Sequence, residues 1–163
     1  MSNMIRISSG VLLTAGALLL SGKASAQPMI LPAAAGFSYD VSKTLCFPKS
    51  GTWKVHYKGS SCGNLSALWH VALPMRHDFA FFEGFSVYAR DATAVATHCF
   101  ATILSTSGQA LRWETVDIGN TEQWYDFETM VVNPNEAAVI ECDIANTTTG
   151  GTSWVSAVRH WGG

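Results

Sequence analysis

The strongest constraint on the fold of this chain is an alternation of apolar and polar side chains with a period of two. In residues 52–58, Trp53, Val55 and Tyr57 alternate with polar neighbours, which is typical of a strand with one face in water. No segment sustains a helical period for three turns, and a short helix or helical turn is expected only around 74–83. The alternation predicts strands at 52–58, 66–73, 84–90, 94–104, 111–117, 123–132, 138–144 and 153–161.

Turn-forming clusters separate these strands and indicate the fold class. Glycine, proline, asparagine, serine and threonine gather at 58–61, 105–108, 133–135 and 146–151. About eight to ten short strands with a turn every dozen or so residues favour an all-β fold, an antiparallel β-sandwich or jelly-roll-like domain. A closed barrel is the alternative that these cues leave open. Because no internal repeat is found, we expect a single domain over residues 37–163.

Residues 1–26 have the features of a cleavable signal peptide. Arg6 precedes an apolar run at 11–20, and alanines stand at positions −3 and −1 of the expected cleavage site. A run of about ten residues is too short for the roughly 20 that a membrane-spanning helix needs, which disfavours the alternative of an uncleaved anchor. Residues 27–36 follow without charge and with two prolines, and they are predicted to form an extended N-terminal arm.

All four cysteines follow the expected cleavage site. An even number of cysteines in a small exported domain predicts two disulfides. The spacings of 16, 37 and 43 residues contain no Cys-x-x-Cys pair, so a zinc site is not indicated. Three connectivities are open to four cysteines. We favour Cys46–Cys62, which closes a local loop, together with Cys99–Cys142, which joins two strands.

The charge of the mature chain narrows the classes of partner. Cleavage removes Arg6 and Lys23 and leaves 8 basic residues against 12 acidic ones. Without a basic cluster, the chain lacks the contacts that bind nucleic-acid phosphates or anionic membranes. No second apolar stretch is long enough to cross a bilayer. We expect a secreted or periplasmic protein with no nucleic-acid partner and no membrane span after signal cleavage.

The residues that carry chemistry form no recognisable catalytic or metal-binding motif. The five histidines have no metal-ligand spacing, although strand pairing can bring His56, His98 and His160 toward Glu141 or Asp143. No Gly-x-Ser-x-Gly motif is present, and disulfide-bonded cysteines are not available as thiolates. One acidic stretch leaves a glycosidase-type carboxylate pair open: Glu114, Asp117, Glu122, Asp126 and Glu128. We predict no catalytic residue, no metal and no cofactor.

The aromatic content suggests a binding surface. All six tryptophans follow residue 26, and a flat indole ring stacks on sugar rings while nearby polar groups bind hydroxyls. The alternative is that tryptophan fills the space between two sheets, which we expect for Trp53 and Trp69. Polar residues at 120–123 flank Trp124 and Tyr125, and a glycine turn at 150–151 precedes Trp154, which favours exposure of these three rings. The predicted ligand-binding residues are Trp124, Tyr125, Trp154 and Asp126.

Two classes of function fit these observations. The first is an exported, non-enzymatic domain that binds a protein partner, self-associates or has a structural role at the cell envelope or exterior. Here the uncharged residues 28–36 could pair with the sheet edge of a neighbouring molecule. The second is a lectin-like carbohydrate-binding module that holds polysaccharide on exposed tryptophan and tyrosine rings.

Overall fold

Ten strands and two short 3-10 helices make up the part of the chain that the computed structural model describes. The described residues are 28–49, 53–58, 62, 66–74, 80–147 and 151–162, so the predicted signal peptide lies outside them. The elements are β1 (Met29–Pro32), η1 (Ala33–Ala35), β2 (Phe37–Ser38), η2 (Val41–Cys46), β3 (Ser66–Leu73), β4 (Phe81–Asp91), β5 (Thr97–Leu104), β6 (Ala110–Ile118), β7 (Gln123–Asp126), β8 (Met130–Val132), β9 (Ala137–Ala145) and β10 (Ser153–Gly162).

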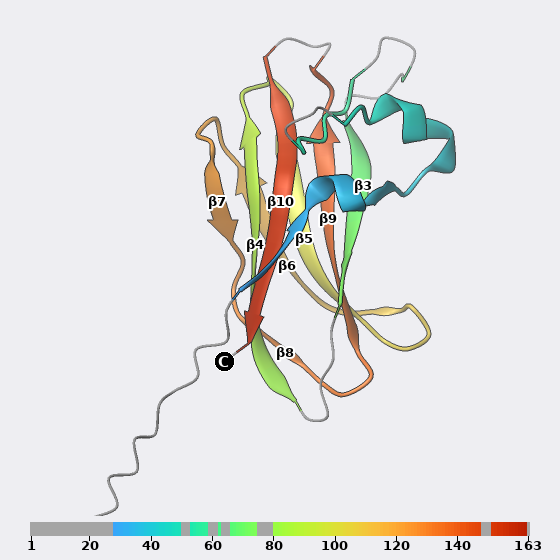
Figure 1. The fold of residues 1–163 in the computed structure, drawn as a ribbon, viewed down its shortest axis with the longest axis vertical. Coiled ribbons are helices and arrows are strands. Elements are labelled where there is room, and N and C mark those ends of the chain that lie inside the picture. The colour runs from blue at the N-terminus through green and yellow to red at the C-terminus, as the bar shows by residue number, and fades with distance from the viewer. Residues whose placement is uncertain are drawn as a thin grey trace, which may run out of the picture.

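The strands form two antiparallel sheets that pack face to face (Figure 1). Sheet A has the order β1-β10-β4-β7, and β8 pairs with the far end of β4. Sheet B has the order β2-β3-β9-β5-β6. The predicted fold class, an all-β antiparallel sandwich of eight to ten strands, is confirmed.

The core lies between the two sheets because each strand turns its apolar side chains inward. On β4 the inward positions are Phe85, Val87 and Ala89, and all three are fully buried. On β9 the inward Ile140 and Ile144 alternate with acidic residues that face outward. Full burial of one large aliphatic side chain contributes about 1.5–3 kcal/mol, so these inner faces supply most of the driving force for folding.

Both predicted disulfides are confirmed. Cys99 and Cys142 lie directly opposite each other on β5 and β9, with Cα atoms 4.1 Å apart, and their side chains are buried. This disulfide joins two neighbouring strands of sheet B. Cys46 and Cys62 join the end of η2 to the chain that follows the segment 53–58.

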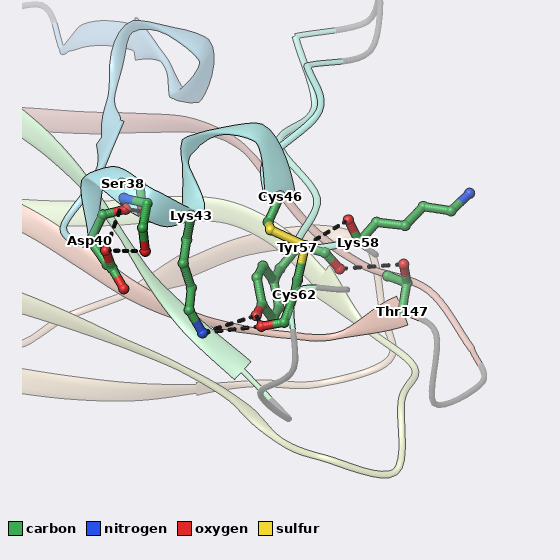
Figure 2. The surroundings of a disulfide bond; sticks show 9 residues. Ser38, Asp40, Lys43, Cys46, Tyr57, Lys58, Cys62 and Thr147 are labelled. Carbon is green, nitrogen blue, oxygen red and sulfur yellow. Dashed lines mark hydrogen bonds between the residues drawn. A yellow bond between two sulfur atoms is a disulfide. The ribbon is translucent and has the colours of Figure 1, made fainter. Parts of the chain in front are cut away.

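The segment 53–58 bridges the two sheets beside the Cys46–Cys62 disulfide (Figure 2). Val55 pairs with Val155 of β10 through hydrogen bonds of 2.7 and 3.0 Å. Tyr57 is buried and donates its hydroxyl to the main-chain oxygen of Cys62 (2.8 Å), while its own main-chain oxygen accepts from the N–H of Thr147 (3.0 Å). This segment therefore extends the edge of sheet A and ties it to the end of β9.

The N-terminal segment is built into the sandwich instead of standing outside it. β1 pairs in register with residues 157–160 of β10. Ala33 is fully buried in the core, and its main-chain oxygen accepts a hydrogen bond from the Trp69 indole N–H (3.0 Å). Lys49 donates to the main-chain oxygen of Ala34 (2.5 Å). The extended arm predicted for residues 27–36 therefore contributes a strand and, through Ala33, a core residue.

Two local expectations are wrong, and one element was missed. Trp53 has a positive φ of 65° and is 62% exposed, so it breaks the alternation that predicted a core position. A helix around 74–83 is contradicted at residues 81–83, which belong to β4; residues 75–79 lie outside the described part. The 3-10 helix η2 was not predicted. Its N-cap is Asp40, whose carboxylate accepts a hydrogen bond from the Ser42 N–H (2.9 Å).

Candidate functional site

Three of the predicted binding residues lie on the outer face of sheet A, on which aromatic and cationic side chains alternate. The rings of Trp124 and Trp154 lie 5.3 and 6.0 Å from the ring of Tyr88. The guanidinium of Arg159 lies 4.3 Å from the Trp124 ring centroid and 5.0 Å from that of Trp161. We call this set the sheet A row: Lys54, Trp154, Tyr88, Trp124, Arg159 and Trp161.

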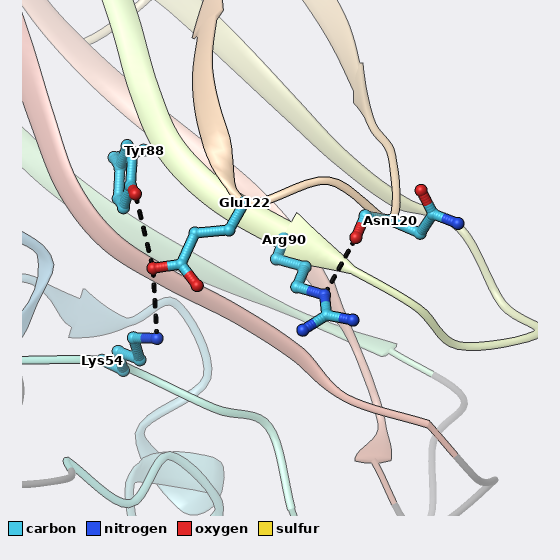
Figure 3. A network of polar contacts seen from close by, with 5 residues as sticks. All are labelled: Lys54, Tyr88, Arg90, Asn120 and Glu122. Atoms are coloured by element: carbon cyan, nitrogen blue, oxygen red, sulfur yellow. Dashed lines mark hydrogen bonds and ion pairs between the residues drawn. The ribbon is translucent and has the colours of Figure 1, made fainter.

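Polar contacts hold Lys54 of the sheet A row and the neighbouring Arg90 in place. Glu122 accepts hydrogen bonds from Lys54 and from the Tyr88 hydroxyl, both at 3.4 Å, and Arg90 donates to the main-chain oxygen of Asn120 at 2.9 Å (Figure 3). Desolvation, and after it the negative charge of Glu122, raises the pKa of Tyr88. The Tyr88 hydroxyl donates its hydrogen bond to the same Glu122 oxygen that receives Lys54.

At the other end of the row, Arg159 is clamped between two side chains. It donates to Asp126 (3.2 Å) and to the Ser86 hydroxyl (3.1 Å), and Ser86 itself donates to Asp126 (2.5 Å). The predicted site residue Asp126 is thus occupied with these partners. A cation fixed over an indole ring competes with any other group that would stack on that side of the ring.

The structure differs from the sequence analysis at two of the predicted binding residues. Trp154 was expected to be exposed but is only 4% exposed, because the ammonium of Lys54 lies 3.6 Å from its ring centroid and Tyr88 packs beside it. Tyr125 is partly buried and packs against the core, while its hydroxyl donates to the main-chain oxygen of Thr121 (2.7 Å) and accepts from the Gly119 N–H (3.0 Å) in the exposed turn before β7. Tyr125 therefore holds the turn before β7.

Three rings that are open to solvent lie on sheet B, and two others are Trp53 (62% exposed) and Phe82 of β4 (66% exposed). Phe37 on β2 is 56% exposed, Tyr39 just after it is 71% exposed, and Trp113 on β6 is 62% exposed. These residues lie at the two opposite edges of sheet B, since β2 and β6 are its outermost strands. Among the described residues, no ring or cation packs on the Trp113 indole.

Between these edges, the outer face of sheet B presents hydrogen-bonding and acidic side chains. Strand register places His70, Glu141, Phe100 and Thr115 in one row across the sheet, starting from Phe37. A neighbouring row contains Leu68, Asp143, His98 and Asp117. No lysine or arginine occupies an outward position of these described strands.

His70 forms the floor beneath the two exposed rings at the β2 edge. The Tyr39 ring stacks on the imidazole at a centroid distance of 5.3 Å with an interplanar angle of 19°, and the Phe37 ring lies 5.8 Å away. On the other side, Nδ1 of His70 lies 3.4 Å from a Glu141 carboxylate oxygen. Burial lowers the pKa of His70, and the Glu141 charge opposes this shift only in part. The imidazole is thereby biased toward its neutral form.

A cleft of about 450 Å³ lies beside Trp113, between the β6 edge of sheet B and β8 of sheet A. Arg112 and Glu114 line it from β6, and Thr129, Met130 and Val131 line it from the other sheet. Arg112 forms an ion pair with Glu136. Burial disfavours the charged form of Glu136, but hydrogen bonds from Asn133 and the charge of Arg112 outweigh burial and lower its pKa.

The histidines and the acidic stretch do not converge on one centre. His98 contacts Asp117 (2.6 Å), His160 is buried in the sandwich 3.6 Å from Glu83, and His56 contacts the main-chain oxygen of Ser153 (3.0 Å). Within the described part of the chain, no group of three potential metal ligands is found. Glu114 and Asp117 belong to sheet B, whereas Glu122 and Asp126 lie on the outer side of sheet A. Glu128 follows β7, and its side chain is exposed.

Sequence reasoning missed Phe37, Tyr39 and Trp113. For Trp113 the pattern carries little signal, because the inward positions of β6 include Arg112 and Glu114 as well as Val116 and Ile118. For Phe37 and Tyr39, a usable signal was the presence of two aromatic residues separated by one serine directly after an apolar segment.

No protein-family model matches the chain, and no curated protein sequence is significantly similar to it. A solved structure described as "BiXyn10A CBM1 APO" aligns with a TM-score of 0.54 at 10% identity, covering 82% of this chain and 96% of that one. The CBM36-1 domain of a multidomain xylanase from the hindgut metagenome of Trinervitermes trinervoides aligns with a TM-score of 0.49 at 8% identity, covering 82% and 96%. A Podospora anserina GH26-CBM35 β-(1,4)-mannanase aligns with a TM-score of 0.47 at 8% identity, and the alignment covers 83% of this chain and 28% of that one.

The first of these likenesses shows the fold. The chain is a disulfide-bonded β-sandwich of two five-stranded sheets, and it shares its fold with the structure described as "BiXyn10A CBM1 APO". In the described part of the chain, no helix has the length and hydrophobicity needed to cross a membrane.

Proposed function

We propose that this protein is an exported, non-enzymatic domain that binds polysaccharide on the outer face of sheet B. The observation that carries the proposal is the exposure of Phe37, Tyr39 and Trp113 at the two edges of one sheet face. The pair Phe37 and Tyr39 forms an exposed aromatic patch, Trp113 provides a second ring on the same face, and the C–H face of a pyranose stacks on such rings.

The space between the rings suits a chain of sugars better than a single sugar. Four strand spacings of about 4.8 Å separate β2 from β6, so the two edges are about 19 Å apart. The Glu141 and Asp143 carboxylates lie between them at the sheet centre, and the Asp117 carboxylate lies toward the β6 edge. Carboxylates accept hydrogen bonds from sugar hydroxyls, so stacking at the edges and hydrogen bonding at the centre would act on one extended ligand.

The fold and the disulfides support the same proposal. The architecture shared with a carbohydrate-binding module is compatible with sugar binding on a sheet face. Two disulfides support export, since such bonds form and persist in oxidising compartments such as the periplasm or the cell exterior. The acidic residues lie on different sheets and serve no shared centre, which supports a binding role over catalysis.

The proposal is tested by retention of the mature protein in gels that contain soluble polysaccharides, compared with a gel that contains none. We expect retention by at least one neutral polysaccharide, and a dissociation constant raised about tenfold or more by Tyr39→Ala, because an open stacking ring is lost. Leu45→Ala is the matched control, since Leu45 is 95% exposed but lies on η2. Retention by no polysaccharide, or equal retention of both variants, would contradict the proposal.

A further inference from the structure

Strand β6 is the one long, uncovered edge among the described strands. It has nine residues, contains no proline and pairs with β5 alone. The other edges are short or interrupted: β2 has two residues, β1 has four and ends in a proline, and β7 and β8 are separated by residues 127–129. Natural sheets usually protect a long edge, because its unpaired main-chain groups recruit another strand.

The register shows which main-chain groups of β6 are unpaired. Cys99 and Cys142 lie opposite each other with Cα atoms 4.1 Å apart, the close spacing of a pair that exchanges no main-chain hydrogen bonds. Cys99 therefore directs its N–H and C=O to Val116 on the other side. By alternation, the even-numbered residues of 112–116 bond to β5, and the odd-numbered residues of 113–117 direct their N–H and C=O to the open edge.

We propose that β6 of a second copy of this chain pairs antiparallel with β6, with the twofold axis at Trp113. This register pairs residues 110–116 of one copy with 116–110 of the other. Trp113 then meets Trp113 of the second copy through outward main-chain groups, and Leu111 lies opposite Thr115. The charged pair is self-complementary, because Arg112 of each copy lies opposite Glu114 of the other.

The alternative registers lose this complementarity. With the axis at Thr115, Arg112 and Glu114 lie opposite Ile118 and Val116, and Trp113 lies opposite Asp117. Opposite charges in direct cross-strand register stabilise a pair, and a charge opposite an apolar residue gains nothing. The register at Trp113 is therefore the one in which the charges of the edge attract a second copy.

The surroundings of the edge leave room for this contact. The cleft of about 450 Å³ beside residues 112–114 is open, so the opposite sheet does not cover the edge there. Arg112 engages Glu136 through one terminal nitrogen, and its buried Nε has no hydrogen-bond partner among the described residues. A guanidinium has five N–H donors, so it can hold Glu136 and Glu114 of the second copy together.

Pairing at this edge would create one continuous ten-stranded sheet with the two Trp113 rings side by side on its outer face. Both Trp113 rings would remain on the same surface as Tyr39 and Phe37 of each copy, because directly opposed residues share a face. The pairing does not depend on the proposed sugar binding. If the outer face of sheet B binds sugar, the dimer doubles the length of that face and raises its avidity for a polymer.

Sedimentation velocity of the mature protein and of two variants at position 115 tests the pairing. Thr115→Pro removes an N–H that faces the open edge and leaves the hydrogen bonds to β5 intact. Thr115→Val keeps that N–H and is the matched control. We expect a dimer for the unsubstituted protein and for Thr115→Val, and a dissociation constant at least tenfold higher for Thr115→Pro, with folding of all three checked by circular dichroism.

Thiol cross-linking tests the register. In the proposed dimer the Cα atoms of the two residues at position 113 are about 5.5 Å apart, whereas those at position 111 are about 14 Å apart. A short bifunctional thiol reagent should therefore link Trp113→Cys into a covalent dimer and leave Leu111→Cys monomeric. A monomer at all concentrations of the unsubstituted protein, a dimer that Thr115→Pro does not weaken, or preferential linking at position 111 would overturn the inference.

Discussion

The two outer faces of the sandwich both carry aromatic side chains, but the tryptophans of sheet A are covered by cations, whereas Phe37, Tyr39 and Trp113 on sheet B are open. The open ring on sheet A is Phe82 of β4. On sheet A, Trp124 and Trp154 pack beside Tyr88, and Arg159 and Lys54 lie over their rings. On sheet B, the rings at the edges are free of cations. The cations around a ring, more than the number of rings, therefore decide which face can bind a ligand.

The charges of the two faces explain this difference. The sheet A side contributes Lys54, Arg90 and Arg159, and carboxylates hold two of these cations over the indoles. The outer face of sheet B has carboxylates and histidines and no described lysine or arginine at an outward position. Cation–π contacts contribute about 0.5–2 kcal/mol each, so the sheet A row stabilises the fold and does not offer its tryptophan rings to a ligand.

The largest effect that separates the two faces is expected at Trp154. Trp154→Ala removes a ring that is 96% buried by Lys54, Tyr88 and their neighbours, so we expect the free energy of unfolding to fall by about 3–5 kcal/mol. Chemical denaturation measures this loss. A change below about 1 kcal/mol would mean that the ring is not packed as described and that the sheet A row is open.

Removing residues 28–36 is expected to lower the free energy of unfolding by about 3 kcal/mol. The deletion exposes the β10 edge, removes the buried Ala33 and leaves the Trp69 indole N–H without its acceptor. Thermal and chemical unfolding of the mature and shortened chains measure the effect. If the shortened protein were equally stable and only its oligomeric size fell, the segment would act between molecules, as the sequence analysis suggested, and not within one.

Trp124→Ala sharpens the comparison at a position that the sequence analysis assigned to sugar binding. The ring is half-buried under Arg159, so we expect a moderate loss of about 1–2 kcal/mol in the free energy of unfolding. Retention on polysaccharide should be unchanged, because the ring is already occupied. A folded Trp124→Ala protein that has lost retention would move the binding face to sheet A.

The smallest effect is a dependence of stability on pH. Burial lowers the pKa of His70 on sheet B and of His56 beside sheet A below the ordinary value of 6.5. The unfolded chain therefore takes up protons near pH 6.5 that the folded chain takes up only at lower pH, so the free energy of unfolding should fall as the pH drops from 7 to 5.

Substitution at His70 tests whether this residue causes the pH dependence of the free energy of unfolding. His70→Gln should flatten the fall between pH 7 and 5, measured by urea denaturation at each pH. His98→Gln is the control, because His98 lies in an exposed pair with Asp117. A fall that both variants retain in full would show that His70 is not the buried neutral group described above.

The fold could be read from the sequence where a strand has one clear apolar face. The bounds predicted for residues 66–73 are those of β3, and the alternation indicated that Cys99 and Cys142 both face inward, as the structure has them. Alternation fixes which face is buried, and pairing of cysteines follows when both face the same core. At Trp53 the same reasoning failed, because a positive φ turns the chain out of the strand.

The candidate site could be read only in part, because exposure depends on contacts between distant segments. The pattern could place Trp124 and Asp126 on one face of a strand. It could not show that Arg159 would cover the first and bind the second. On β6 both faces mix apolar and charged residues, so the period gave no reason to single out Trp113.

The most direct test of the central claim is to map the bound face by nuclear magnetic resonance. Isotope-labelled mature protein is titrated with an oligosaccharide cut from the polysaccharide that retains it most strongly. The account predicts that the largest amide and side-chain shifts fall on Phe37, Tyr39 and Trp113, with little change at Tyr88, Trp124 and Trp154. Shifts confined to the sheet A residues would contradict it.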